Sequence, residues 1–390
     1  MRRFLKTLGL VNLRELKIIR VRPIFLLASV AVLAFNALFY TTFLRDGLPY
    51  DLPIGVVDMD NSSTSRNFIA QLDATQLGKV IQYADYHDAD FDMQRGNITG
   101  YVILPENFNA ELQAQHRPTI PFYVNSLYFV GGALAYKDML QMVIMTNGAV
   151  ERQVLRMKGV PESQIMARLQ PIALDQHQIG NTTTNYGAYL NNLLLPGILQ
   201  MSIILLTIYA IGQEMKYRTS RHLLEMAGGS MEVAMLGKLL PYTVIFTVLG
   251  VLTELFLYHW MDYPLAGSML SMCVAILALV LASEAIGIFI IEMIPSLRLA
   301  ISVGAIFSVL GLTLAGFTLP LEAMPKPIQG LAAMYPLRHY YLLYIQEGIF
   351  GAGFGAWWQQ LVYMLLFLFL PALGFGRLHK AYLYQNYSQD

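Results

Sequence analysis

Six long apolar segments, separated by polar stretches, dominate the pattern of this chain. They are Pro23–Leu44, Leu190–Ile211, Leu239–Trp260, Ala266–Ile291, Leu299–Leu319 and Trp358–Phe375. A helix needs roughly 20 residues to cross a hydrocarbon layer about 30 Å thick, and each segment is close to that length. The first segment is too long for a signal peptide and lacks a small-residue cleavage site. The pattern predicts an α-helical polytopic membrane protein with six transmembrane helices, the first at residues 23–44, and the other five within residues 190–376.

Residues 45–189 have a different character, richer in Asp, Asn, Gln and Tyr. Short apolar stretches alternate there with stretches of helical spacing. The predicted strands are Leu52–Val57, Lys79–Tyr83, Ile98–Leu104 and Thr119–Val124, and the predicted helices are Thr64–Leu77, Asp88–Gly96, Pro105–Gln115, Ser126–Lys158 and Pro161–Leu169. Extended Gln170–Ile179 then returns the chain to the membrane. We expect a small α/β domain with its own core and a long helix.

Basic residues gather at three places and predict the orientation of the chain. They are Arg2, Arg3, Lys6, Arg14, Lys17, Arg20 and Arg22 before the first span, Lys216, Arg218, Arg221 and Lys238 after the second, and Arg377 and Lys380 after the last. Positive residues favour the cytoplasmic side, so we expect both termini there, with residues 377–390 as a tail and residues 45–189 extracytoplasmic. Trp260, Trp357 and Trp358 then fall at outer ends of spans, where indole rings favour the headgroup layer.

Residues 1–22 have an amphipathic pattern. Apolar side chains fall on one side of a helical wheel and most basic side chains fall opposite; the apolar ones are Phe4, Leu5, Leu8, Val11, Leu16, Ile18 and Ile19. One interpretation is a cytoplasmic interface helix that lies along the inner leaflet. The other is a basic flank of the first span with no further role.

Composition agrees with a membrane protein and excludes several other classes. Hydrophobic residues make up 55% of the chain and charged residues 13%, with 26 basic and 26 acidic side chains. Because the charges balance and the basic residues are confined to short loops, we expect no nucleic-acid partner. The single cysteine, Cys273, allows no disulfide framework.

The segment 213–238 places a charged stretch between two apolar spans. Closely spaced basic residues such as Lys216, Arg218 and Arg221 are not expected in a helix that faces lipid. We therefore predict a cytoplasmic coupling helix that contacts a partner. Its candidate contact residues are Glu214, Lys216, Arg218, Thr219, Arg221, Leu223 and Leu224. We expect Leu223, Leu224 and Met226 to anchor the helix in a groove of the partner, with the charges setting partner choice.

Several stretches, taken in order, resemble the ABC transporter type-2 permease family, in the subgroup with a large extracytoplasmic domain between spans one and two. They are Ile54-Gly55-Val56-Val57-Asp58-Met59-Asp60, Tyr101-Val102-Ile103-Leu104-Pro105-Glu106-Asn107-Phe108, the loop after the second span, Met324-Pro325 and Tyr335-Pro336-Leu337-Arg338. The family's loop after span two reads Glu-Arg-Glu-x-Gly-Thr, followed by paired leucines. Glu214, Thr219, Leu223 and Leu224 match it, whereas Lys216 and Arg218 replace an acid and a glycine.

The resemblance implies a permease that forms a homodimer or heterodimer and is driven by a separate ATP-binding cassette subunit on the cytoplasmic side. The chain contains no G-x-x-x-x-G-K-[ST] loop, because Gly237-Lys238 is followed by Leu239. It also lacks H-E-x-x-H, a G-x-S-x-G elbow and a metal-spaced His/Cys cluster. We therefore predict a transport subunit with no catalytic or metal residues and no bound cofactor, while the partner subunit uses ATP and Mg.

Function follows from the resemblance only in outline. It implies an exporter that moves an amphipathic or lipid-like substrate or drug out of the cytoplasm or inner membrane of a bacterial cell, in contact with membrane lipids. Similar permeases work with a periplasmic adaptor protein. The alternative is a membrane-anchored adaptor or receptor that uses the extracytoplasmic domain to bind a partner. That alternative leaves six spans and a charged internal segment without a purpose.

Three acids lie within or at the ends of spans, where a carboxylate costs on the order of 2.5–3.5 kcal/mol on insertion scales. For Glu254 the alternatives are a role in transport or gating and a simple reach toward the outer interface. For Glu284, nearer the middle of its span, they are such a role and a structural hydrogen bond. Glu292 is interpreted as the cytoplasmic end of its helix.

The fifth span carries small residues at helical spacing, namely Ala300, Gly304, Ser308, Gly311 and Ala315. Such a stripe permits close approach of another helix in lipid. Two neighbours remain open: a span of the same chain, or the second subunit at a dimer seam. In the second case we expect the segment Pro320–Pro327 to dip back from the outer surface and close the seam.

Overall fold

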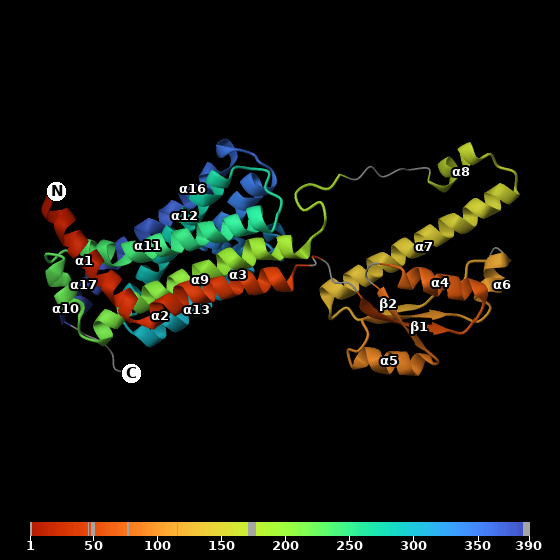
Figure 1. The fold of residues 1–390 in the computed structure, drawn as a ribbon, viewed down its shortest axis with the longest axis horizontal. Helices are drawn as coiled ribbons and strands as arrows, with labels where there is room; N and C mark the ends of the chain where they lie inside the picture. Colours follow the sequence, from red (N-terminus) through yellow and green to blue (C-terminus); the bar gives the residue numbers. More distant parts are fainter. Residues whose placement is uncertain are drawn as a thin grey trace. The chain divides into compact units, whose positions relative to one another are not determined.

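The computed structural model describes residues 2–45, 47, 51–75, 78–114, 116–170 and 177–384. The chain divides into two compact units. One consists of Met1–Gly47 with Gln178–Asp390, and we call it the helical unit; the other is Leu48–His177, the sheet unit (Figure 1). Each is described by itself. The sequence analysis set the sheet unit at 45–189, and the extended stretch that it predicted after Gln170 lies largely outside the described residues.

Six described helices of the helical unit are long and apolar enough to cross a membrane. They are Pro23–Phe43, built from α2 (Pro23–Leu26), η1 (Leu27–Ala31) and α3 (Val32–Phe43); α9 (Tyr186–Lys216); Met231–Trp260, built from α11 (Met231–Leu255) and η2 (Phe256–Trp260); α12 (Met269–Met293); α13 (Leu297–Leu314); and Phe354–Leu373, built from α16 (Phe354–Leu366) and η5 (Phe367–Leu373). Each overlaps one of the six predicted segments, which confirms that these segments form helices long and apolar enough to cross a membrane.

Helix α9 is the central element of the helical unit. Both α12 and α13 pack along it, and it buries side chains over most of its length. Close contact is possible because glycines face their neighbours: a Cβ at Gly287 would lie 2.9 Å from Cβ of Thr207, and one at Gly212 would lie 2.7 Å from Leu297 Cδ1. In lipid such backbone approach supplies the packing that holds helices together.

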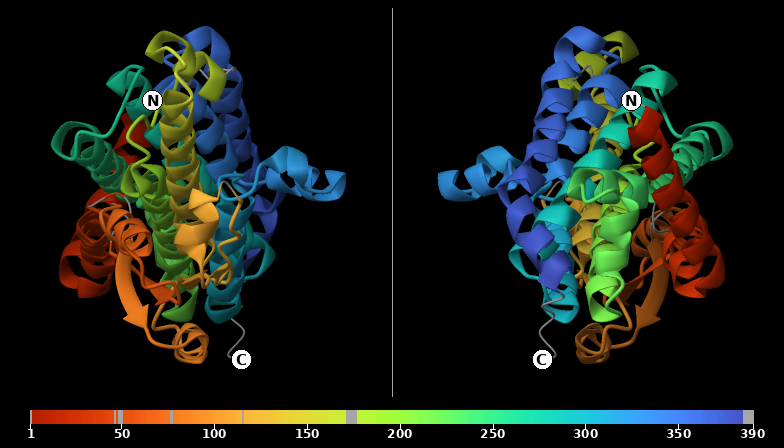
Figure 2. Two further views of the ribbon diagram at one scale, coloured as in Figure 1. Left: turned by 90° about the vertical axis from the view of Figure 1, so that its right-hand side faces the viewer. Right: turned by 90° about the vertical axis from the view of Figure 1, so that its left-hand side faces the viewer.

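Shorter helices close the two ends of the bundle. At one end lie α1 (Arg2–Val21), α10 (Ser220–Met226) and α17 (Phe375–Tyr384), and we call this the α10 end (Figures 1 and 2). The chain between α13 and α16 forms η3 (Leu321–Ala323), α14 (Lys326–Ala332), α15 (Pro336–Leu343) and η4 (Tyr344–Ile349). Figure 2 shows η3 and α14 standing out from the side of the bundle.

The fifth span is shorter than predicted. We expected it to run to Leu319, but α13 ends at Leu314. The reason is Gly316, whose φ of +81° is the left-handed conformation that commonly terminates helices. The segment Pro320–Pro327, which we expected to dip back from the outer surface, contains η3 and the first residues of α14.

The sheet unit is a four-stranded sheet with helices on both faces. Its elements are β1 (Leu52–Asp58), α4 (Ser63–Asp73), β2 (Gly78–Tyr83), α5 (Tyr86–Gln94), β3 (Gly100–Leu104), α6 (Phe108–Gln113), β4 (Phe122–Val124), α7 (Phe129–Met157) and α8 (Glu162–Leu169). The strand order is β2-β1-β3-β4, with β1 parallel to both neighbours and β4 antiparallel to β3. The predicted α/β alternation and long helix are confirmed.

Successive side chains of a strand point to opposite faces of the sheet, so the sheet unit has one hydrophobic core on each face. On one face Ile54, Val56, Val102 and Leu104 pack against α4 and α7. On the other face, Val57 and Tyr101 pack toward α5 (Figure 1). Because both faces are covered, the central strands are apolar nearly throughout.

One helix of the sheet unit starts later than predicted. We placed Pro105 in its first turn, but α6 begins at Phe108 because Asn107 adopts a left-handed φ of 62°. Asparagine tolerates this conformation better than most residues. The residues before Phe108 therefore form a turn, where the sequence predicted the first turn of the helix.

The first prediction tests whether the sheet unit has an independent core. In an isolated fragment of Leu48–His177, Leu104→Ala should lower the free energy of unfolding by about 2–5 kcal/mol, because it leaves a cavity. Leu127→Ala is the control, since Leu127 is 92% exposed. Chemical denaturation followed by circular dichroism measures both. A fragment without a cooperative transition would contradict the prediction.

Candidate functional site

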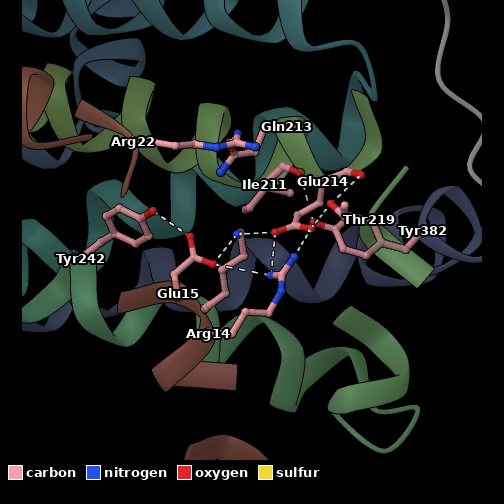
Figure 3. A network of polar contacts seen from close by, with 10 residues as sticks. Arg14, Glu15, Arg22, Ile211, Gln213, Glu214, Thr219, Tyr242 and Tyr382 are labelled. Atoms are coloured by element: carbon pink, nitrogen blue, oxygen red, sulfur yellow. Dashed lines mark hydrogen bonds and ion pairs between the residues drawn. The ribbon is translucent and has the colours of Figure 1, made fainter. Parts of the chain in front are cut away.

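Four charged side chains meet inside the α10 end of the helical unit. Arg14 and Glu15 come from α1, Glu214 from the last turn of α9, and Lys238 from the second turn of α11. We call them the buried ion cluster (Figure 3). The side chains of Glu15 and Lys238 are fully buried and that of Glu214 nearly so, while Arg14 retains slight exposure. Two cations and two carboxylates make the cluster neutral overall.

Each charge in the cluster is matched by close partners. Arg14 donates to both oxygens of Glu214 at 2.9 Å, a bidentate arrangement. Nζ of Lys238 donates to Glu15 Oε2 at 2.7 Å and to Glu214 Oε1 at 2.8 Å. The Tyr242 hydroxyl donates to the other oxygen of Glu15 at 2.7 Å. Charge-assisted bonds of this kind are the strong ones, and their geometry fixes α1, α9 and α11 against one another.

The electrostatics of Arg14 follow from these contacts. Burial acts to lower the pKa of its guanidinium, but the hydrogen bonds that it donates to Glu214 and the negative charges of Glu214 and Glu15 outweigh burial and raise the pKa above its ordinary value. Arg14 therefore stays charged and keeps compensating the buried carboxylates.

The turn after α9 is built on the same glutamate. The Thr219 hydroxyl donates to the Glu214 carboxylate, and the Thr219 N–H donates to the Glu214 carbonyl at 2.9 Å. Arg218 between them has a φ of 58°, in the left-handed region. This explains the motif that the sequence resembles: its acid and threonine close the turn, and its glycine stands where the backbone is left-handed.

Helix α17 and the junction after α1 are also fastened to this end. The Ser220 hydroxyl donates to the Tyr382 carbonyl at 3.0 Å, and the Tyr382 hydroxyl donates to the Ile211 carbonyl at 3.1 Å. Arg22 donates to Gln213 Oε1 at 2.5 Å (Figure 3). Its guanidinium group also lies over the Tyr217 ring, 4.9 Å from the ring centroid.

The structure corrects the predicted coupling helix in two respects. It is not continuous over 213–238, because Glu214 and Lys216 belong to α9, and α10 spans only Ser220–Met226. Leu223 and Leu224 are 0% and 3% exposed and belong to the chain's own core, so they cannot anchor it in a partner's groove. Paired leucines on an amphipathic helix look the same from sequence whether they face a partner or the same chain.

The basic members of the predicted set do lie on the surface. Lys216, Arg218 and Arg221 are exposed, and Arg221 pairs with Glu225, a further exposed side chain, at 3.3 Å. We call Lys216, Tyr217, Arg221, His222 and Glu225 the α10 surface. The structure thus divides the predicted contact residues into a buried part that holds the turn and an exposed part that is accessible to a partner.

Glu15 and Tyr242 were missed by the sequence analysis, and Lys238 was interpreted only as a basic flank. A signal was present: Glu15 is the one acid among the many basic residues of 1–22, and Lys238 stands beside an apolar run. An isolated charge of opposite sign in such a place calls for a partner, but the partner cannot be identified from the sequence.

The three acids of the spans are all buried. Glu254 does not reach an interface, which corrects that alternative: it is 1% exposed and accepts from the Tyr340 hydroxyl at 2.6 Å. Glu284 accepts from the Thr243 hydroxyl at 3.0 and 2.8 Å, as the structural alternative expected. Glu292 lies at the end of α12 as expected, but among the described residues neither of its oxygens has a hydrogen-bond partner.

A further buried acid, Glu347 in η4, ties together the loops at the other end of the bundle. It accepts from the Ser268 and Gly353 N–H groups at 2.9 and 3.1 Å and from Trp357 Nε1 at 2.9 Å. Burial acts to raise the pKa of Glu347, but these donors and the Ser271 hydroxyl hold it below its ordinary value. Trp357 is therefore buried instead of lying in a headgroup layer, unlike exposed Trp260.

The stripe of small residues on α13 is occupied by the same chain. Ala300, Gly304, Ser308, Gly311 and Ala315 are all buried. A Cβ at Gly304 would lie 2.7 Å from Ile208 Cδ1, and one at Gly311 would lie 3.2 Å from Gln200 Nε2. Both neighbours belong to α9, so the stripe packs within the chain, and a dimer seam formed by its residues is wrong.

Comparison with known proteins places this architecture in a family. Residues 23–375 match the family described as "ABC-2 family transporter protein". This chain belongs to the ABC-2 transporter family. It is also similar to two proteins named "Inner membrane transport permease YhhJ", from Escherichia coli (strain K12) and Shigella flexneri. Each is 28% identical over 331 residues, which cover 83% of this chain and 82% of the relative.

Membership of the ABC-2 family confirms the resemblance inferred from the sequence. Together with six apolar helices, it makes the chain a multi-pass membrane protein and a transport subunit, not a catalytic enzyme. The family implies an ATP-binding partner in general. The described residues contain no group of three or more His, Cys, Asp or Glu side chains able to hold a metal ion.

The second prediction concerns the buried ion cluster. Lys238→Met should lower the free energy of unfolding by about 3–5 kcal/mol, because Glu15 and Glu214 lose a cation while staying buried. Lys216→Met is the matched control: Lys216 is exposed, and its loss should change stability by less than about 0.5 kcal/mol. Thermal unfolding of the detergent-solubilised protein compares the two. Equal melting temperatures would contradict the prediction.

The third prediction concerns the packing of α13 on α9. In a Cys273→Ser background, Gly304→Cys with Ile208→Cys should be joined within one chain by a short thiol crosslinker. The control pair is Ser302→Cys with Ile208→Cys, because Ser302 faces outward. Electrophoresis and mass spectrometry identify the products. A crosslinked dimer as the main product of the first pair would show that the stripe faces another subunit.

Proposed function

We propose that this chain is the membrane-spanning permease subunit of an ATP-driven exporter that moves an amphipathic or lipid-like substrate or drug out of the cytoplasm or inner membrane. A separate ATP-binding cassette subunit hydrolyses ATP and docks on the α10 surface. Family membership supports the division of labour, because it implies an ATP-binding partner. The relatives named inner membrane transport permeases support the bacterial inner membrane as its location.

The observation that carries the proposal is an exposed charged surface on a rigidly fastened base. Arg221, His222 and Glu225 face outward from α10, while Leu223 and Leu224 fix the opposite side of the helix in the core. A force applied to such a surface moves the base with it. Exposed charges at the rim of an interface set partner choice and association rate more than affinity.

The buried ion cluster provides the connection from that surface to the spans. Glu214 is hydrogen-bonded to Thr219 at the end of the turn, to Lys238 of α11 and to Arg14 of α1. Displacement of α10 therefore acts on the ends of α9, α11 and α1 together, since breaking one contact leaves a buried charge without its partner.

The remaining parts of the proposal concern topology and assembly. Both termini and the α10 end face the cytoplasm, where the basic residues gather. The sheet unit is extracytoplasmic, and a periplasmic adaptor docks there. The permease works as a dimer, with another copy or with a second permease, and the two chains meet on a surface other than the α13 stripe.

The fourth prediction tests ATPase docking. Tagged protein purified from native membranes in mild detergent should carry an ATP-binding cassette protein, identified by mass spectrometry. The double variant Lys216→Glu/Arg221→Glu should retain roughly tenfold less of it, a loss of about 1.4 kcal/mol. Both side chains are exposed, so the melting temperature should stay unchanged.

The control is Glu151→Lys on α7, an exposed charge change of the sheet unit. It should leave the amount of ATP-binding protein unaltered. If Lys216→Glu/Arg221→Glu copurifies as much ATP-binding protein as the native chain, docking on the α10 surface is wrong. If no ATP-binding protein accompanies the native chain, the membrane-anchored adaptor or receptor becomes the better account.

A further inference from the structure

A small cavity lies within the helical unit between the first span, α9 and α11. Its volume is about 10 Å³, which is room for one water molecule. Most of its lining is apolar and includes Leu33, Leu199 and Ile276. Its polar side chains are Asn36, Thr253 and Glu254.

Glu254 is the buried ionisable group of this cavity, and only one of its two carboxyl oxygens has a hydrogen-bond partner among the described residues. Its Oε1 accepts from the Tyr340 hydroxyl at 2.6 Å, whereas its Oε2 has no hydrogen-bond partner among the described residues. The titratable groups that face it are Tyr340 of α15, Tyr258 of η2, Tyr344 of η4 and Cys273 of α12. No lysine or arginine of the described residues is among them.

The other polar groups of the cavity offer acceptors to a water molecule. One of the two N–H groups of the Asn36 amide donates to the Val32 carbonyl at 2.7 Å, and Asn36 Oδ1 remains able to accept. The Thr253 hydroxyl donates to the Leu249 carbonyl at 2.9 Å, which leaves its oxygen as an acceptor. A water that donates its two hydrogens to these two oxygens can accept a hydrogen bond from Oε2 when Glu254 is protonated. The protonated carboxyl group completes this arrangement, because the ionised form has no O–H to donate.

We propose that Glu254 is a proton-binding site inside the membrane, loaded and unloaded through one water molecule held in this cavity by Asn36 and Thr253. On loading, an O–H bond of the protonated water breaks as an O–H bond to Oε2 forms, and no electron is transferred. A carboxylate without a cation is costly in an apolar interior, so the neutral form is the resting one.

The proton-binding site is joined to two tethers between helices. The Tyr340 hydroxyl connects α15 to α11 through Glu254, and the Tyr258 hydroxyl donates to Asn192 Oδ1 at 2.7 Å, connecting η2 to α9. Loss of the proton places a negative charge among these hydroxyl groups, so proton binding and the packing of α9, α11 and α15 are coupled. This inference does not depend on the α10 surface or on the ATPase.

Infrared difference spectroscopy of the full chain in lipid vesicles tests the proton. The spectrum of the native chain minus that of Glu254→Gln should contain the carbonyl band of a protonated carboxylic acid at neutral pH and lose it at alkaline pH. The glutamine variant keeps an acceptor for Tyr340, and an unchanged melting temperature shows that it folds. A difference spectrum with carboxylate bands alone at neutral and acid pH would overturn the proposal.

Dicyclohexylcarbodiimide provides a second measurement, because it adds to protonated carboxyl groups in apolar surroundings and forms a stable acylurea. Peptide mass spectrometry should find the label on Glu254, with less of it as pH rises. Glu347 is the internal control: it is buried, but its four donors keep it charged, so it should stay unlabelled. Label on Glu347 and none on Glu254 would count against the proposal.

The water route is tested by the polar lining. Thr253→Val and Asn36→Leu remove the two acceptors while leaving Glu254 in place. In heavy water, the carboxylic acid band of Glu254 should shift several-fold more slowly in the double variant than in the native chain. An unchanged exchange rate would show that the proton reaches Glu254 by another path.

Discussion

The α10 end of this molecule depends on the neutralisation of four charges inside the protein. Arg14, Glu15, Glu214 and Lys238 are supplied by three helices far apart in the sequence, and each is satisfied only when the others are present. Burial of any one alone would cost several kcal/mol. The helix ends must therefore assemble together, and the turn after α9 and the outward face of α10 follow from that assembly. Charge matching thus adds a specific constraint to the apolar packing of the same helices.

Local patterns made much of the fold predictable from the sequence. A membrane span requires a long apolar run, and a strand of a small sheet requires a short apolar run between turns. Both runs can be recognised in the sequence without knowing which segments they contact in the fold. The six spans and the βαβ order of the sheet unit were predictable for this reason. Failures at element ends have local causes as well: left-handed Asn107 delays α6, and left-handed Gly316 ends α13 before Leu319.

Contacts between distant segments could not be predicted in the same way. Lys238 fits the pattern of a basic flank, and Leu223 and Leu224 fit that of a docking helix, until the fold places all three in the interior. The small residues around Gly304 and Gly311 likewise predicted close packing against another helix, but they did not identify α9 as that helix. A sequence records that a charge or a small side chain is needed, but the identity of its partner is a tertiary fact. The exposed positions Lys216 and Arg221 were predictable because exposure needs no partner.

The buried acids of the helical unit differ in what their surroundings supply. Glu15 and Glu214 meet cations, and Glu347 meets four N–H or O–H donors, so each has partners that suit a carboxylate. Glu284 and Glu254 meet only hydroxyl groups, from Thr243 and Tyr340. A carboxylate matched by cations resists change, whereas one matched by a single hydroxyl can bind a proton with little rearrangement. Mechanical connection and sensitivity to protons therefore belong to different parts of the bundle, and α9 and α11 run between them.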